Sequence, residues 1–135
     1  MSYKMGDAAR HVGVNVETIR FYEREGILPP PSRTASGRRV FTTTDLKTLA
    51  FIRKARDLGF TLPDVRALLA LRGPDNNCAD VKEIALKHLN VVRAEKTRIV
   101  EVERLLSQAI EKCPGGSTKA CTLLALLETT PEAED

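Results

Sequence analysis

The chain has 135 residues, of which 42% are hydrophobic and 29% are charged, with a formal net charge of +3. No apolar run approaches the length of a membrane span, and the start MSYKMGDAAR lacks the apolar core of a signal peptide, so we expect a soluble cytoplasmic protein without a membrane partner. The charge is distributed unevenly along the chain. Residues 1–72 hold 13 Lys or Arg against 7 Asp or Glu, whereas residues 73–135 hold 8 Lys or Arg against 11 Asp or Glu. The N-terminal part is therefore the candidate surface for a polyanion.

The beginning of the chain is predicted to form a helix-turn-helix. An apolar periodicity predicts a short helix over residues 5–12 that ends at Gly13, because glycine commonly terminates a helix. Asn15 is a good N-cap for a second helix, and Gly26 stands just beyond the expected end of that helix. The tight turn between the two helices has the spacing of this motif.

The second helix of the pair is the candidate recognition helix. Such a helix presents its N-terminal half and one exposed face to the major groove, so we expect Thr18, Arg20 and Tyr22 to offer base-edge, phosphate and sugar contacts. The alternative is an ordinary packing helix, in which Ile19 and Phe21 belong to the core and the arginine is merely solvated. The helix taken alone leaves both interpretations open.

A wing and two further helices are expected next. The segment LPPPSRTASGRRVF, residues 28–41, holds three prolines, a glycine and two short extended runs, which suits a small hairpin or wing. A third helix fits residues 44–58, with Gly59 as its stop. A fourth helix starts after Thr61, because the Pro and Asp that follow suit a first turn, and it runs to about Arg72.

A long helix then occupies about residues 80–112, or starts near Cys78, and CTLLALLE after it can form a terminal helical turn or two. An apolar seam along the long helix repeats in alternating steps of three and four residues, which is the heptad pattern of a coiled coil. The seam consists of Cys78, Val81, Ala85, His88, Val92, Glu95, Ile99, Val102, Leu106, Ala109 and Cys113. Its two cysteines are roughly 50 Å apart, so only an antiparallel partner would bring Cys78 of one chain to Cys113 of the other. We therefore expect a homodimer with two thiol clusters.

The third cysteine completes a candidate metal site. Cys113 and Cys121 bracket the loop CPGGSTKAC, whose glycines let the backbone fold around an ion, and thiolates favour soft ions such as Hg(II), Cd(II), Pb(II), Zn(II) or Cu(I). With Cys78 of the partner subunit the site becomes a three-thiolate site, which suits Hg(II) and also Pb(II) or Cd(II), with two ions per dimer. Zn(II) is disfavoured because it usually recruits histidine or carboxylate and the loop contains no histidine. The alternative is three cysteines that serve as small apolar core residues.

Three segments of the sequence, GVNVETIRFYEREGIL, SGRRVF and FIRKARDLGFTLPDV, resemble the N-terminal domain of the MerR family of winged-helix transcription regulators. The resemblance covers essentially the whole chain and implies a mainly α-helical protein. It implies a winged helix-turn-helix DNA-binding domain over residues 1–73, a linker and long antiparallel coiled-coil dimerisation helix over residues 74–112, and a metal-binding loop, short helix and tail over residues 113–135.

The resemblance also implies contacts with promoter DNA from the recognition helix, the wing and the third helix. Relatives commonly carry Tyr in the wing where this chain has Arg38, which we expect to meet a phosphate. The full set of candidate DNA contacts is Thr18, Arg20, Tyr22, Arg33, Arg38, Arg39, Arg53 and Arg56. The family further implies a promoter with an overlong spacer, repression without metal, and underwinding of the DNA when metal binds, so that RNA polymerase engages both promoter elements.

Other functions are compatible with the same residues. The loop CPGGSTKAC also resembles that of copper-responsive relatives, which are expected to carry Ser in place of Cys78, so a Cu(I) sensor is one alternative. A second is a thiol redox sensor in which Cys113 and Cys121 form a disulfide. A third, a metal buffer or small thiol enzyme, leaves the basic N-terminal part unexplained, and we expect no enzyme because neither histidine has a partner arrangement that suggests catalysis.

Overall fold

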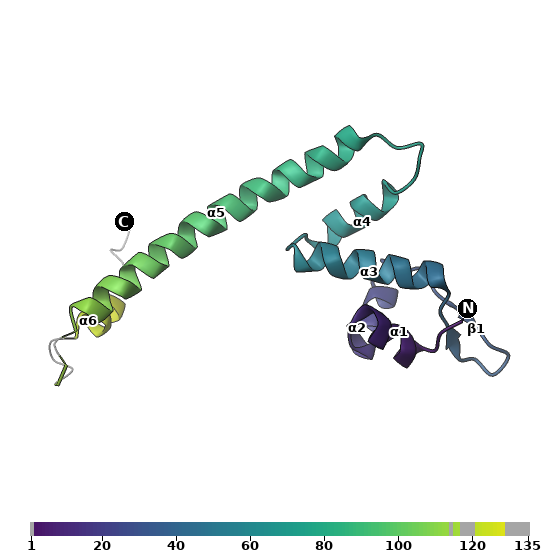
Figure 1. Ribbon diagram of the computed structural model, residues 1–135, viewed down its shortest axis with the longest axis horizontal. Helices are drawn as coiled ribbons and strands as arrows, with labels where there is room; N and C mark the ends of the chain where they lie inside the picture. The colour runs from purple at the N-terminus through teal and green to yellow at the C-terminus, as the bar shows by residue number, and fades with distance from the viewer. Residues whose placement is uncertain (1, 114, 117–120, 129–135) are drawn as a thin grey trace, which may run out of the picture. The chain divides into compact units, whose positions relative to one another are not determined.

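The computed structural model describes residues 2–113, 115–116 and 121–128. The elements in chain order are α1 (Met5–Val12), α2 (Val16–Arg24), β1 (Ser32–Arg33), β2 (Arg39–Val40), α3 (Thr43–Asp57), α4 (Leu62–Ala70), α5 (Cys78–Glu111) and α6 (Thr122–Glu128) (Figure 1). The mainly α-helical fold predicted from the sequence is confirmed. None of the helices within the described ranges is both long and apolar enough to cross a membrane.

The chain divides into two compact units. The first, Met1–Ala85, is called the head here, and the second, Leu86–Asp135, is called the distal unit. The head contains the helix-turn-helix, the hairpin and α4, and the distal unit contains most of α5 together with α6. The boundaries predicted from the sequence, at residues 73 and 112, separate the DNA-binding, dimerisation and metal-binding parts of the chain. They are defined by function and not by compactness, and they stay predictions.

The two N-terminal helices begin and end where the sequence predicts. Gly13 closes α1 with a φ of +78°, and its N–H donates to the Ala9 carbonyl at 2.8 Å. Glycine reaches this left-handed conformation without the steric cost of a side chain. After the turn, the side chain of Asn15 caps α2 by accepting from the Thr18 N–H at 2.8 Å. The turn thus fixes the direction in which α2 leaves α1.

The predicted wing is a two-stranded antiparallel hairpin of β1 and β2. Its register places Arg33 directly opposite Arg39, and Gly37 in the connecting turn has a φ of +87°. A bridge between Tyr3 and Phe41 exchanges two backbone hydrogen bonds, of 2.8 and 2.7 Å, and so holds the start of the chain beside the hairpin. Two like charges therefore face one another on a short hairpin, which is destabilising unless an anion lies nearby.

The third helix is shifted by one residue from the expected range 44–58. The side chain of Thr42 accepts from the Asp45 N–H at 3.1 Å, and the Asp45 carboxylate accepts from the Thr42 N–H at 2.9 Å. This reciprocal capping box satisfies two backbone donors and starts α3 at Thr43. At the other end Leu58 is the C-cap and not the last helical residue.

The fourth helix starts as predicted and ends early. Thr61 caps α4, as expected, by accepting from the Asp64 N–H, but the helix ends at Ala70 and not at Arg72. Leu71 already acts as the C-cap, with its N–H directed at carbonyls of the last turn. The long helix begins at Cys78, the earlier of the two expected starts.

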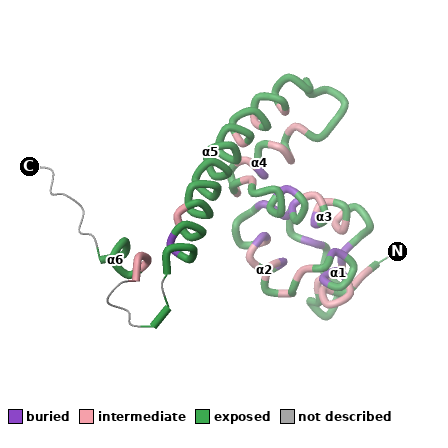
Figure 2. Tube along the Cα trace, turned by 60° about the vertical axis from the view of Figure 1, so that its left-hand side comes forward, coloured by how far each residue is buried: buried purple, intermediate pink, exposed green. Residues whose placement is uncertain are grey.

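The hydrophobic core of the head gathers around α1, α2 and α3, where the purple segments of Figure 2 meet. The largest fully buried side chains are Phe41, Ile19, Leu28, Leu49, Ile52 and Val65. Complete burial of such a side chain contributes about 1.5–3 kcal/mol. Ile19 lies in this core and Phe21 packs against it, as the interpretation of α2 as a packing helix requires, while Arg20 is exposed. The head is therefore held by its own apolar side chains.

The distal unit buries little. In α5 the only buried residue within the described part of the chain is Ala109, and Figure 2 shows the helix exposed over most of its length. The large apolar residues of the predicted seam that fall in this unit, Val92, Ile99, Val102 and Leu106, are 41–57% exposed. The stripe that the heptad pattern marks as an interface is thus uncovered in the single chain.

Candidate nucleic-acid interface and cysteine ligands

The three candidate DNA contacts on α2 differ in how available they are. The side chain of Arg20 is 44% exposed and forms an ion pair with Glu17, one turn earlier on the helix. The hydroxyl of Thr18 donates to Asn15 Oδ1 at 2.8 Å and so belongs to the helix cap. Tyr22 is only 7% exposed and is part of the core. Arg20 is therefore the freest of the three, and DNA contact by each of them stays a prediction.

A basic hollow of about 340 Å³ lies between the wing and α2. It is lined by Lys4, Met5, Arg20, Arg33, Gly37, Arg38 and Arg39. The fold thus brings together four of the predicted DNA-contact arginines, although they come from a helix, from both strands of a hairpin and from the turn that joins the strands. The sequence analysis missed Lys4, for which the only signal was a cation directly before the first helix of a helix-turn-helix. Five cations around one concavity suit the phosphates of a nucleic-acid backbone.

The wing arginines differ in how they are held. Arg33 Nη1 donates to the Gly37 carbonyl at 2.8 Å, which closes the turn of the hairpin. Within the described residues no ion pair or side-chain hydrogen bond of Arg38 is found, and this residue is exposed. Arg38 is therefore the wing cation whose charge is least engaged within the chain.

Arg39 is held by an acidic residue of α2. Its Nε lies 3.0 Å from Glu23 Oε2, and the two side chains are 28% and 12% exposed. The contact is an ion pair and not an aligned hydrogen bond, because Arg39 Nε has no hydrogen-bond partner among the described residues. The second carboxylate oxygen, Glu23 Oε1, is buried and also has no hydrogen-bond partner among them. The sequence analysis assigned Glu23 no role, although an acid among the cations of a recognition helix was a visible signal.

The two candidate contacts on α3 make backbone contacts within the head. Arg53 Nη1 donates to the Val12 carbonyl at 2.5 Å, and its Nε lies 3.6 Å from Asp57 Oδ2. Arg56 Nη1 donates to the Phe60 carbonyl at 2.8 Å. The Arg53 guanidinium therefore satisfies the last carbonyl of α1, where a cation is favoured by the helix dipole, and Arg56 satisfies a carbonyl in the loop between α3 and α4. Neither residue lines the basic hollow, and their contact with DNA stays a prediction.

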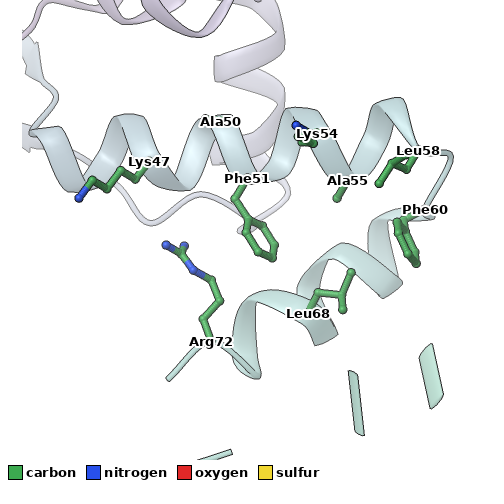
Figure 3. A pocket seen from close by; sticks show the side chains of 9 residues that line it. All are labelled: Lys47, Ala50, Phe51, Lys54, Ala55, Leu58, Phe60, Leu68 and Arg72. Carbon is green, nitrogen blue, oxygen red and sulfur yellow. The ribbon is translucent and has the colours of Figure 1, made fainter. Parts of the chain in front are cut away.

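A second hollow, of about 420 Å³, lies between α3 and α4 and has a different chemistry (Figure 3). Apolar side chains line it, among them Phe51, Leu58 and Leu68. The Arg72 guanidinium lies over the Phe51 ring, 5.0 Å from its centroid, in a cation–π contact. Lys47, Lys54 and Arg72 also line this hollow, but its apolar side chains suit an apolar partner better than a phosphate, so the hollow beside the wing is the better candidate for DNA.

The three cysteines are free thiols at the ends of helices. Cys78 is the first residue of α5, Cys113 follows its last turn, and Cys121 directly precedes α6. The first two are exposed and Cys121 is half-buried. No cluster of three or more His, Cys, Asp or Glu able to hold a metal occurs among the described residues. Residues 114 and 117–120 of the predicted loop lie outside them, and the predicted site needs a second chain, so it stays a prediction.

Comparison with known proteins identifies relatives over nearly the whole chain. The family described as "MerR HTH family regulatory protein" matches residues 3–71, and the family "MerR, DNA binding" matches residues 46–109. The "Heavy metal-dependent transcription regulator 1" of Rhizobium meliloti (strain 1021) is 38% identical over 122 residues, which cover 89% of this chain and 83% of the relative.

Two solved structures share the fold. The transcription regulator PbrR691 of Ralstonia metallidurans CH34, in complex with lead(II), superposes with a TM-score of 0.76 at 32% identity, over 93% of this chain and 98% of that one. The dual-function regulator MerR of Bacillus megaterium MB1, in complex with mercury(II), gives a TM-score of 0.67 at 27% identity, over 93% of this chain and all of that one. The predicted combination of a winged helix-turn-helix with a long helix is thereby confirmed.

Proposed function

The chain belongs to the MerR family of transcription regulators, and from this premise we propose that it is a heavy-metal-responsive regulator that binds promoter DNA as a homodimer. On binding a thiophilic divalent ion it activates transcription by RNA polymerase. The observation that carries the DNA-binding part is the basic hollow, where cations of α2 and the wing meet around one concavity.

The homodimer is supported by the uncovered seam of α5. Val92, Ile99, Val102 and Leu106 recur at the heptad spacing and are 41–57% exposed. Apolar residues in this register pack against a second helix of the same kind, and their burial drives the association. An antiparallel arrangement is proposed because it places Cys78 of one subunit near the loop of the other.

The metal site is proposed to consist of Cys113 and Cys121 together with Cys78 of the partner subunit. The donor set fits a soft ion, because all three thiols are free and each has at least partial access to solvent. Three thiolates suit Hg(II) best and then Pb(II) or Cd(II), and the lead(II) and mercury(II) complexes of the two structural relatives support this range. Because the dimer is symmetric, it holds two ions.

The proposal is tested by reporter induction with Hg(II), Pb(II), Cd(II), Zn(II) and Cu(I) measured side by side, in the wild type and in Cys78→Ser. We expect Hg(II) to induce most strongly and the variant to lose induction by divalent ions while it keeps the dimer and its DNA binding. Normal Hg(II) induction in Cys78→Ser would rule out the shared three-thiolate site. Titration should saturate at two ions per dimer.

The competing sensors give different results in the same assay. A Cu(I) sensor with a two-thiolate site would respond to Cu(I) in both the wild type and Cys78→Ser, since Cys113 and Cys121 suffice. A thiol redox sensor would be induced by an oxidant without added metal, and it would lack the sulfur-to-metal charge-transfer band that Hg(II) gives with thiolates. Both the Cu(I) sensor and the redox sensor are transcription regulators and not enzymes.

The separation of the two sites is tested by Arg20→Ala. Loss of one phosphate contact should weaken binding to duplex DNA roughly 5- to 10-fold at 0.1 M salt. The affinity for Hg(II) should not change, because the predicted ligands lie at the ends of α5 and α6. Loss of metal binding in this variant would show that the two functions had been assigned to the wrong residues.

A further inference from the structure

An acidic side chain pairs with one of the cations that line the basic hollow, which the proposed function assigns to DNA. Glu23 is the most enclosed charged side chain among the ion pairs of the described residues, with 12% of its side chain exposed. Its carboxylate lies 3.0 Å from Arg39 Nε, and Arg39 in turn lines the basic hollow. A largely enclosed carboxylate beside a nucleic-acid surface costs desolvation and repels phosphate, so its presence needs a physical reason.

The register of the wing supplies that reason. Arg33 and Arg39 are directly opposite each other on β1 and β2, and like charges in that position repel. The Arg33 side chain turns along the hairpin to the Gly37 carbonyl. Arg39 is compensated instead from α2, by the carboxylate of Glu23. One ion pair therefore joins the recognition helix to the wing, the two elements that line the hollow.

We propose that Glu23 is a positioning residue for DNA binding, which holds the Nε edge of Arg39 so that the rest of the guanidinium lines the basic hollow. This inference rests on the proposed function. Arginine can act in this way because its planar guanidinium has several N–H donors in a fixed geometry, so one edge can pair with a carboxylate while another meets a phosphate. Glu23 itself does not touch DNA.

If Glu23 positions Arg39, its removal changes the affinity for DNA in the direction opposite to that expected from charge alone. Removal of a negative charge from a DNA-binding surface should tighten binding if only Coulomb forces act. If Glu23 positions Arg39, its removal weakens binding because Arg39 loses its orientation. Glu17 is the matched control, since it also lies on α2 and pairs with an arginine, Arg20, but its side chain is 73% exposed.

The experiment measures binding of the full chain to a random-sequence duplex of about 30 base pairs over a range of salt concentrations. We expect Glu23→Gln to weaken binding at least about threefold, and Glu17→Gln to leave it unchanged or tighter. Arg39→Gln should weaken binding roughly 5- to 10-fold at 0.1 M salt and lower the salt slope by about 0.9, which is the loss of one phosphate contact. In the double variant Glu23→Gln with Arg39→Gln, the first change should add nothing.

The following results would overturn the positioning role of Glu23 or the proposed function. Binding of Glu23→Gln that is as tight as the wild type, or an additive double variant, overturns the positioning role. An unchanged salt slope in Arg39→Gln also overturns it, because Arg39 would then be only a structural link. If the wild type does not bind the duplex at all, the proposed function itself fails.

A second variant covers the case in which Glu23→Gln does not fold. Arg39→Lys keeps the positive charge but lacks the planar group that can pair on one edge and meet a phosphate on another. It should lose most of the affinity that Arg39→Gln loses. Wild-type affinity in Arg39→Lys would show that charge alone matters and would overturn the inference.

Discussion

The head and the distal unit use apolar side chains in opposite ways. In the head, Phe41 and Ile52 are completely buried, and residues of four helices and the wing surround one core. In the distal unit, the seam of α5 also carries Val, Ile and Leu, but Val92, Ile99, Val102 and Leu106 remain 41–57% exposed. Similar residue types therefore form a closed core in one region and an uncovered apolar face in the other.

The two regions therefore depend on protein concentration in different ways for their stability. A core closed within one chain has a free energy of unfolding that does not depend on protein concentration. A helix whose apolar face is covered only by a partner is stabilised by association, so its unfolding midpoint rises with concentration. The two tyrosines both lie in the head and the chain has no tryptophan, so tyrosine emission reports on the head while circular dichroism reports on all helices.

The largest effect is expected from Phe41→Ala. Phe41 is 0% exposed and also exchanges backbone hydrogen bonds with Tyr3, so truncation leaves a cavity where the wing meets the core. Urea denaturation followed by tyrosine emission should show a loss of about 3–5 kcal/mol in the free energy of unfolding. The loss should be the same at all protein concentrations. A concentration-dependent loss would mean that the head is not an independent core.

Next in size is a change on the seam, Val102→Ala, compared with Val100→Ala. Val102 occupies a heptad core position and is 41% exposed, whereas Val100 lies outside the seam and is 55% exposed. Both substitutions raise helix propensity equally. The difference between their effects on the stability of the dimer therefore reports on burial at the interface. We expect Val102→Ala to weaken the dimer by about 2 kcal/mol, counting both subunits, and Val100→Ala to leave it intact.

The dimer is measured by sedimentation and by the concentration dependence of the circular dichroism midpoint. Equal effects of the two substitutions would contradict the heptad register. If the circular dichroism midpoint of the wild type does not change with protein concentration, α5 is not stabilised by association, and the proposed difference between the head and the distal unit is wrong.

A smaller effect is expected at the turn of the helix-turn-helix, from Gly13→Ala. Alanine at a φ of +78° is strained, and its Cβ would overlap Arg53 Nη1, so the guanidinium must shift away from the Val12 carbonyl. Gly26→Ala is the matched control, because Gly26 also has a positive φ but its Cβ would meet nothing within 4 Å. We expect a loss of about 1 kcal/mol in the control and up to about 2 kcal/mol in Gly13→Ala. Equal losses in tyrosine-monitored unfolding would show that Arg53 does not brace the turn.

Much of the fold could be predicted from local signals in the sequence. Gly13 and Asn15 mark the turn through a left-handed cap and a side-chain cap, and both act as expected. The structure starts and ends α3 one residue before the predicted bounds, because Thr42 and Asp45 cap the helix reciprocally. The predicted end of α4 at Arg72 is too late, because the Leu71 N–H already donates to carbonyls of the last turn and caps the helix after Ala70.

The candidate site was less predictable, because it depends on contacts between distant segments. The cations of the basic hollow come from residues around 4, 20 and 33–39, and only the fold brings them to one concavity. Nothing local shows that Tyr22 is buried or that Glu23 reaches Arg39. The heptad register predicts that the partner of Cys78 lies on a second chain, and this part of the site stays a prediction.

The smallest effect is expected from Glu101→Gln in α5. A side-chain hydrogen bond from Arg104, and then its charge, lower the pKa of Glu101, although both side chains are about half exposed. A carboxylate with a lowered folded pKa stabilises above its unfolded pKa, and this contribution is lost as the pH falls through the folded pKa.

The helical midpoint of Glu101→Gln should therefore lie slightly below that of the wild type at neutral pH, and the gap should close in acid and in high salt. Glu103→Gln is the control, since no ion pair of Glu103 is found in the described part of α5. A gap that persists in acid would show that Glu101 contributes through packing. The exposed pair on α5 should thus differ from the enclosed Glu23–Arg39 pair of the head, because solvent screens the first far more than the second.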